Sequence, residues 1–218
     1  MEAQINRKNV LDYLKITQAD DATMLTIDKL EKELLALCSI KKSVKICDTK
    51  IVDGYYALEG TDITLDSNDI NALFTKTDKI AMFALSLGIE VDKKILYYSK
   101  TSITQMIILD ALASCYIEEL CEELNENINT TMQNKHHTVR FSAGYGDLNI
   151  NKQKQIVDTL GGYKKLGITV GASSMMLPQK SITAFVGYSD FPQKSDYKCA
   201  QCALQKCDPI CAKRKKNA

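Results

Sequence analysis

The strongest constraint on the fold is a helical periodicity that runs without interruption over residues 102–129. Four leucines and a tyrosine recur three or four residues apart, which places them on one face of an α-helix: Leu109, Leu112, Tyr116, Leu120 and Leu124. Asp110, Ser114 and Glu118 form a second stripe at positions i, i+4 and i+8. On pattern alone, a polar stripe of this kind indicates a solvated face.

Shorter elements are expected on both sides of this helix. Apolar spacing predicts helices over residues 7–16, 90–100 and 152–160, a longer one that begins after Asp20 or Asp21, and one capped by Ser67. Strands are expected over residues 42–51, 79–87, 137–141, 167–176 and 181–188. Val44 and Ile46 share one side of the first strand. Because helices and strands intermingle without a regular βα repeat, we predict an α+β fold with a twisted antiparallel or mixed sheet flanked by helices.

Composition excludes several classes of protein. Apolar residues make up 45% of the 218 residues and charged residues 25%, as in ordinary globular proteins. A formal net charge of +1 argues against a dedicated nucleic-acid binder, which is usually strongly basic. No apolar run reaches the roughly 18 residues of a membrane span, and the N-terminus lacks a signal-peptide pattern. We therefore expect a cytoplasmic protein without nucleic-acid or membrane partners.

The octapeptide at residues 140–147, Arg-Phe-Ser-Ala-Gly-Tyr-Gly-Asp, combines residue types suited to a small ligand. Glycine permits close approach of the backbone, arginine offers a planar fork for a carboxylate or phosphate, and tyrosine adds an aromatic face. Taken alone, the octapeptide is more typical of a strand that ends in a glycine turn.

Two further segments accompany this octapeptide in a fixed order. The helical sequence of residues 111–120 precedes Arg140, Gly144 and Tyr145, and residues 173–183, which contain Met-Met-Leu-Pro-Gln-Lys-Ser, follow them. Together these motifs resemble the activation domain of cobalamin-dependent methionine synthase, and more closely the stand-alone proteins of that family. The resemblance covers roughly residues 79–189.

The resemblance implies a role in methionine biosynthesis. The corrinoid of methionine synthase cycles through a cobalt(I) state that occasionally loses an electron and becomes inactive cobalt(II). The activation module binds S-adenosylmethionine, and a low-potential electron donor supplies one electron. Methyl transfer then traps the reduced cobalt as methylcobalamin. The implied partner is the cobalamin-binding domain of methionine synthase or of another corrinoid protein.

The resemblance also implies a set of ligand-binding residues. Arg140 matches the arginine that contacts S-adenosylmethionine, and Glu118 matches a helix carboxylate suited to the ligand's amino group or ribose hydroxyls. Gly144, with Ala143 beside it, would bring the loop backbone close to the ligand, and Tyr145 would lie where ligand and corrin meet. None of these residues is expected to act as an acid, base or nucleophile, because positioning of an activated methyl donor carries the catalysis.

The sequence departs from the family in three places. The family's Gly-Tyr pair is followed by Pro-Ala-Cys-Pro, whereas Gly146 and Asp147 follow it here, so the corrin-facing loop is expected to differ. The acidic residue that holds the adenosine end in the longer domain has no convincing counterpart. The C-terminal part of the longer domain, which contains a strand and is rich in tyrosine, is replaced here by a cysteine-rich tail. Tyr197 in this tail is the candidate for the missing ligand-binding tyrosine.

Four of the eight cysteines, namely Cys199, Cys202, Cys207 and Cys211, crowd into this tail. Four thiolates this close suit tetrahedral zinc or an iron–sulfur cluster, although two disulfides or free thiols remain alternatives. An iron–sulfur cluster could pass the electron to cobalt, whereas zinc has no redox chemistry and would only fold the tail. We therefore favour the cluster over zinc.

Three segments follow from these observations. Residues 1–75 are expected to form an N-terminal α/β segment packed on the main domain, residues 76–190 the activation-domain-like core, and residues 191–218 the metal-binding tail. The competing hypothesis is a small iron–sulfur or zinc protein that serves as an electron carrier or scaffold for corrinoid activation. A methyltransferase of the ordinary dinucleotide-fold type is disfavoured, because no Gly-rich strand–helix turn occurs near the N-terminus.

An iron–sulfur cluster in the tail would be visible directly. We expect anaerobically purified protein to be brown, with visible absorbance and bound iron, and Cys202→Ser to lose both while S-adenosylmethionine binding persists. Colourless protein that contains zinc would overturn the iron–sulfur hypothesis, and metal-free protein would overturn the metal site.

Overall fold

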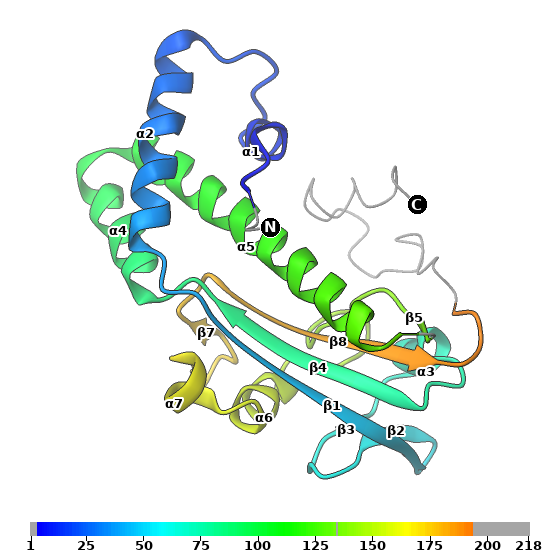
Figure 1. Cartoon of the computed structure of the whole chain (residues 1–218). Helices are drawn as coiled ribbons and strands as arrows, with labels where there is room; N and C mark the ends of the chain where they lie inside the picture. The colour runs from blue at the N-terminus through cyan, green and yellow to red at the C-terminus, as the bar shows by residue number, and fades with distance from the viewer. Residues whose placement is uncertain (1–3, 134, 194–218) are drawn as a thin grey trace.

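The computed structural model describes residues 4–133 and 135–193, and its central element is an antiparallel β-sheet (Figure 1). Its six strands lie in the order β3–β2–β1–β4–β8–β5, and each pair of neighbours runs antiparallel. Their bounds are β1 (Lys41–Val52), β2 (Tyr55–Leu58), β3 (Thr64–Leu65), β4 (Lys79–Ser86), β5 (His136–His137) and β8 (Ser181–Ser189). A separate ribbon pairs β6 (Thr169–Val170) with β7 (Met176–Leu177). The predicted α+β class with an antiparallel sheet is confirmed.

Helices cover both faces of this sheet (Figure 1). The helices are α1 (Arg7–Tyr13), α2 (Asp21–Leu37), α3 (Asn68–Leu73), α4 (Ile89–Thr101), α5 (Ile103–Thr131), α6 (Lys152–Thr159) and α7 (Gly162–Leu166). The long helix α5 crosses one face over β4 and β8, and α1, α2 and α4 pack against α5. On the opposite face α6 contacts β8 and α7 contacts β1 and β4. The helix expected over residues 102–129 is thus confirmed as the main helical layer on its face.

The position of strand β4 between two cores explains why its sequence is continuously apolar. Ala81, Phe83 and Leu85 point into the core beneath α5, whereas Ile80 and Met82 point into the core on the side of α6. Successive side chains of a strand point to opposite faces, so a strand with a core on each side requires apolar residues at every position. The buried strand predicted over residues 79–87 is confirmed for this reason.

Strand β1 is covered less completely. Val44 and Ile46 lie on the same face, as expected, and Val44 pairs with Phe83 beside the α5 core. Both remain 39% exposed, because α5 lies over β4 and β8 rather than over β1. Cys47, on the other face, is buried among the residues of the second core. Of the two faces of β1, the one that carries more apolar residues is therefore the more exposed.

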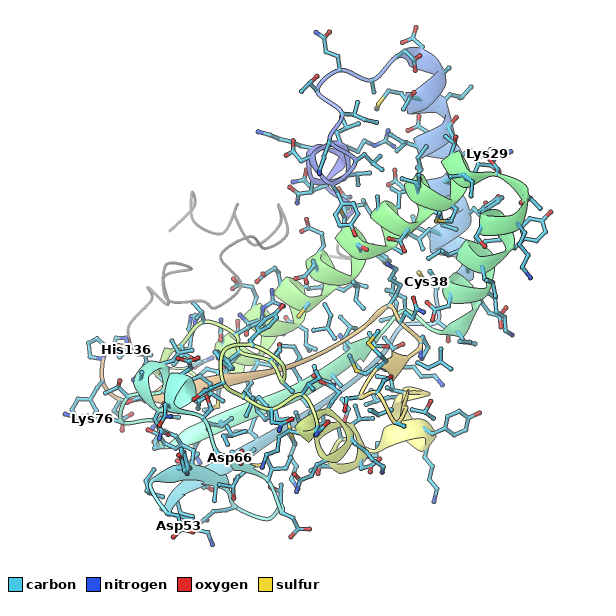
Figure 2. All side chains as sticks on the ribbon, turned by 180° about the vertical axis from the view of Figure 1, so that it is seen from behind. Lys29, Cys38, Asp53, Asp66, Lys76 and His136 are labelled. Carbon is cyan, nitrogen blue, oxygen red and sulfur yellow. The ribbon has the colours of Figure 1, made fainter. Side chains whose placement is uncertain are left out.

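Two expected strands are shorter than predicted. The strand expected over residues 137–141 is reduced to the two residues of β5, followed by a single bridge between Phe141 and Phe185. His136 lies at the same end of the sheet as Lys76 (Figure 2). The prediction of one strand over residues 167–176 is wrong. Only the short strands β6 and β7 pair in this region, and Ser174 turns the chain between them with a φ of 62°. In both places most of the expected strand is replaced by a loop.

The first helices share a core with the main helix. Val10, Ile27, Leu30 and Leu34 are buried in the same cluster as the apolar face of α5. Asp20 caps α2 by accepting a hydrogen bond from the Thr23 N–H at 2.8 Å, as predicted. None of the described helices combines the length and apolarity that crossing a bilayer requires. The division into segments at residues 75 and 190 stays a prediction.

The apolar face of α5 is expected to carry much of the stability. Leu112→Ala removes a fully buried side chain and should lower the free energy of unfolding by about 2–5 kcal/mol. Leu96→Ala is the matched control, because Leu96 is 58% exposed and should change the stability by less than about 0.5 kcal/mol. Urea denaturation followed by circular dichroism measures both, and equal losses would contradict this account of the core.

Candidate functional site

A pocket of about 260 Å³ opens beside the C-terminal half of α5. Its walls come from α5, from the loop that follows β5, from α6, and from the segment that joins β7 to β8. Glu118, Arg140, Ala143 and Tyr145 line it, so four of the five predicted ligand residues meet there although they are distant in sequence. Gly144, the fifth, is not among the lining residues.

Arg140 is held by carboxylates of α5. Its Nη2 lies 2.6 Å from Glu122 Oε1 and 3.2 Å from Glu118 Oε2, and its Nη1 contacts the Cys121 thiol. The side chain is only 8% exposed, and a guanidinium this buried requires neighbouring anions to compensate for lost hydration. The expected contact of Arg140 with a ligand carboxylate must therefore use donors beyond those two ion pairs, and a guanidinium has five N–H groups in all.

The polar stripe of α5 is not a solvated face, and that interpretation was wrong. Asp110 Oδ1 lies 2.7 Å from the ammonium of Lys180, which also donates to Ser114 Oγ at 2.9 Å. Glu118, the third member, pairs with Arg140. The stripe thus faces two cations from distant loops, and all three of its members are half-buried.

The loop that contains Tyr145 is fixed by its own hydrogen bonds. Ser142 Oγ donates to the Thr183 carbonyl at 2.7 Å, and the Gly144 N–H donates to the Leu148 carbonyl at 2.9 Å. Gly144 has a φ of 87°, and a Cβ there would lie 2.9 Å from Ile150 Cδ1. The turn and its contact with Ile150 therefore require glycine, whether or not a ligand is bound.

The departure from the family sequence at Gly146 and Asp147 has a structural role. The Asp147 carboxylate accepts hydrogen bonds from Ser67 Oγ and from the N–H groups of Asn68 and Asp69, at 2.9 Å and 3.2 Å for the two N–H groups. It therefore caps the N-terminus of α3 from a distant loop. A Cβ on Gly146 would lie 2.0 Å from Asp69 Oδ2, so this close approach needs glycine.

Burial disfavours ionisation of Asp147, but the hydrogen bonds from Ser67, Asn68 and Asp69 outweigh it and hold the pKa of this carboxyl below its ordinary value. A lowered pKa in the folded state means that the carboxylate stabilises the fold fully at neutral pH. That stabilisation is lost as the pH falls through the folded-state pKa.

Sequence reasoning missed the buried amide of Gln153. This side chain is 3% exposed and donates to Thr183 Oγ1 at 2.8 Å and to Met176 Sδ at 3.1 Å, and all three residues line the pocket. A signal existed, because Gln153 precedes Ile156, Val157 and Leu160 at helical spacing on the buried face of α6. A polar residue at an apolar position indicates a buried polar contact.

The predicted metal ligands Cys199, Cys202, Cys207 and Cys211, like Tyr197, lie outside the described residues. Within residues 4–133 and 135–193, no group of three or more His, Cys, Asp or Glu side chains could hold a metal ion. The iron–sulfur and zinc hypotheses therefore depend on the tail alone, and the anaerobic measurement decides between them.

Replacement of Asp147 tests the capping of α3. Asp147→Ala should lower the free energy of unfolding by up to about 1 kcal/mol at neutral pH, at the low end for a cap because the site is exposed. The difference from wild type should shrink as the pH falls through the lowered folded-state pKa of Asp147, where the carboxylate becomes protonated.

Asp147→Asn is the matched control, since an amide oxygen still accepts hydrogen bonds but does not titrate. Urea denaturation between pH 3 and pH 7 would refute the capping role if Asp147→Ala were as stable as wild type throughout.

The fold is similar to that of a solved structure described as the crystal structure of the MetH reactivation domain bound to AdoHcy. The two share 16% sequence identity with a TM-score of 0.61, over 88% of this chain and 77% of the other. No curated protein matches the chain. Residues 69–216, more than half of the sequence, match the family described as "Vitamin B12 dependent methionine synthase, activation domain". The chain therefore belongs to the activation-domain family of vitamin B12-dependent methionine synthase.

Proposed function

We propose that this protein is a stand-alone activation component that binds S-adenosylmethionine and supports reductive methylation of cob(II)alamin on a corrinoid methyltransferase, most plainly methionine synthase. Membership of the family and the likeness to a reactivation domain bound to AdoHcy support this role. The observation that carries it is the ion pair of Arg140 and Glu118 on the pocket wall.

This ion pair suits the amino-acid end of the ligand. An α-amino acid carries a carboxylate and an ammonium group a few bonds apart, so it requires a cation and an anion side by side. Arg140 supplies N–H donors for the carboxylate, and Glu118 supplies an acceptor for the ammonium. The pair is largely shielded from water by burial of Arg140, which strengthens both interactions.

The size of the pocket limits how much of the ligand it can enclose. Its 260 Å³ is below the roughly 300–1,000 Å³ of typical pockets for drug-sized ligands. We infer that the amino-acid end enters the pocket and that the sulfonium lies at the mouth, beside the exposed side chains of Tyr145 and Met175. A methyl group at the mouth would be accessible to a cobalt atom held by another protein.

The residues of this chain would bind, orient and shield the ligand rather than transfer protons. S-adenosylmethionine supplies an activated methyl group, and methyl transfer to a reduced cobalt needs no general acid or base. Ser142, Gln153 and Thr183 are tied to one another and to the backbone, so they form a rigid floor. Preorganised positioning of this kind is the main contribution that a protein makes to such a reaction.

Two partners complete the proposal. The acceptor cobalamin would be bound to the cobalamin-binding domain of methionine synthase or of another corrinoid protein, and a low-potential donor would supply the electron. Mixing the protein with inactive cob(II)alamin-loaded methionine synthase, S-adenosylmethionine and a chemical reductant should produce the visible spectrum of methylcobalamin. Product formation at the same rate without this protein would contradict the activating role.

Calorimetry tests the ligand site. We expect wild type to bind S-adenosylmethionine, Arg140→Ala to lose detectable binding, and Glu118→Gln to weaken it by about tenfold, as for loss of a hydrogen bond to a charged group. Circular dichroism should verify that each variant is folded. Tyr163→Ala is the control, because Tyr163 is 72% exposed and does not line the pocket. Absence of binding by wild type, or equal binding by Arg140→Ala, would refute the proposal.

A further inference from the structure

Lys180 makes more contacts than a loop lysine normally does. It lies in the turn between β7 and β8, yet its side chain is only 15% exposed. Its ammonium reaches α5, where it lies 2.7 Å from Asp110 Oδ1 and donates to Ser114 Oγ at 2.9 Å. An ammonium with two short contacts and little solvent exposure is fixed in one orientation, and so is the backbone that carries it.

The same turn is also tied to α4. The Gln179 N–H donates to Asp92 Oδ2 at 2.5 Å, and the neighbouring Lys180 backbone also favours the ionised form of this carboxyl by lowering its pKa. The second oxygen, Asp92 Oδ1, is buried without a hydrogen-bond partner among the described residues. The positive charge of the Lys180 ammonium favours the ionised form of this carboxyl.

This turn forms one wall of the pocket. Gln179 and Ser181, on either side of Lys180, both line it, as do Met176 before the turn and Thr183 after it. The wall and the two helices α4 and α5 are distant in sequence, so only tertiary contacts can fix their relative position. Lys180 contacts α5 through its side chain, and Gln179 beside it contacts α4 through its backbone N–H.

We propose that Lys180 is a positioning residue that locks the Gln179–Ser181 wall of the ligand pocket onto α4 and α5. The identity of the ligand rests on the proposed function, whereas the locking of the wall rests on geometry alone. The side chain of Lys180 points to Asp110 and Ser114, so it acts on the ligand through the neighbouring residues of the turn.

The charges around Asp92 give this role a pH signature. Burial raises the pKa of the Asp92 carboxyl, the N–H groups of Gln179 and Lys180 and the Lys180 ammonium lower it, and the Asp110 carboxylate raises it. Removal of the ammonium should raise this pKa further. Asp92 would then become protonated, and release the turn, at a higher pH than in wild type.

Hydrogen exchange of the ligand-free protein tests the locking directly. In Lys180→Met, the amides of Gln179 and Lys180 should exchange about tenfold faster than in wild type, and the pH at which their protection falls should move upward. Lys180→Arg, which keeps a cation, should restore part of the protection. Lys154→Met is the control, because Lys154 is 68% exposed in its pair with Asp158 and should leave these amides unchanged. Unchanged exchange and pH profile in Lys180→Met would overturn the inference.

Asp110→Asn provides a second variant in case Lys180→Met does not fold. It keeps Lys180 but weakens its ion pair, and it should accelerate the same amides.

Binding separates this inference from the proposed function. In calorimetry, Lys180→Met should bind S-adenosylmethionine about tenfold more weakly than wild type, because loss of the charge-assisted contact with α5 releases the wall of the pocket. Failure of wild type to bind would refute the proposed function, while the exchange experiment would still decide the role of Lys180. Wild-type binding with an unchanged Kd in Lys180→Met would overturn the role of Lys180 alone.

Discussion

The packing of α5 across β4 and β8 is the constraint on which the rest of the structure depends. One face of this helix is buried in the core that it shares with α1, α2 and α4. That burial fixes the rotation of the helix about its axis, so Asp110, Ser114 and Glu118 must face the loops beside β8. The hydrophobic contacts of α5 thus determine where its polar side chains lie, and the candidate ligand site follows from the orientation of this single helix.

Elements with a local signal were predicted well from the sequence. The caps at Asp20 and Ser67 and the continuous apolar run of β4 depend on residues close in sequence. The partners of the charged groups could not be predicted in the same way. A stripe of Asp110 and Ser114 looks the same whether it meets water or Lys180, because the cation is about seventy residues away along the chain. The strand predicted over residues 137–141 was too long for a related reason. The Arg140 side chain pairs with Glu118 of α5, and the alternation of apolar and polar residues does not reveal such a tertiary interaction.

Family membership and geometry support different parts of the functional account. The family match supports a connection with vitamin B12-dependent methionine synthase and extends over residues 69–216, further at both ends than the motifs alone. The geometry supplies what the family cannot, namely which side chains meet. It brings Glu118 and Arg140 to one wall, and it adds Gln153 and Thr183, which carry no motif of their own. Whether these residues hold a ligand is the question that calorimetry answers.

The loop around Tyr145 and helix α3 are linked in a way that restricts how this protein can diverge. Asp147 caps α3, the Asp147 N–H donates a hydrogen bond to Asp69 Oδ2 at 3.1 Å, and the absence of a side chain at Gly146 leaves room for the Asp69 carboxylate. Transplanting the proline-containing loop of the longer relatives into this chain would remove the carboxylate on which α3 begins and collide with its first turn. Loop and helix can therefore be exchanged only as one unit, so a homologue that differs in one should carry a matching change in the other.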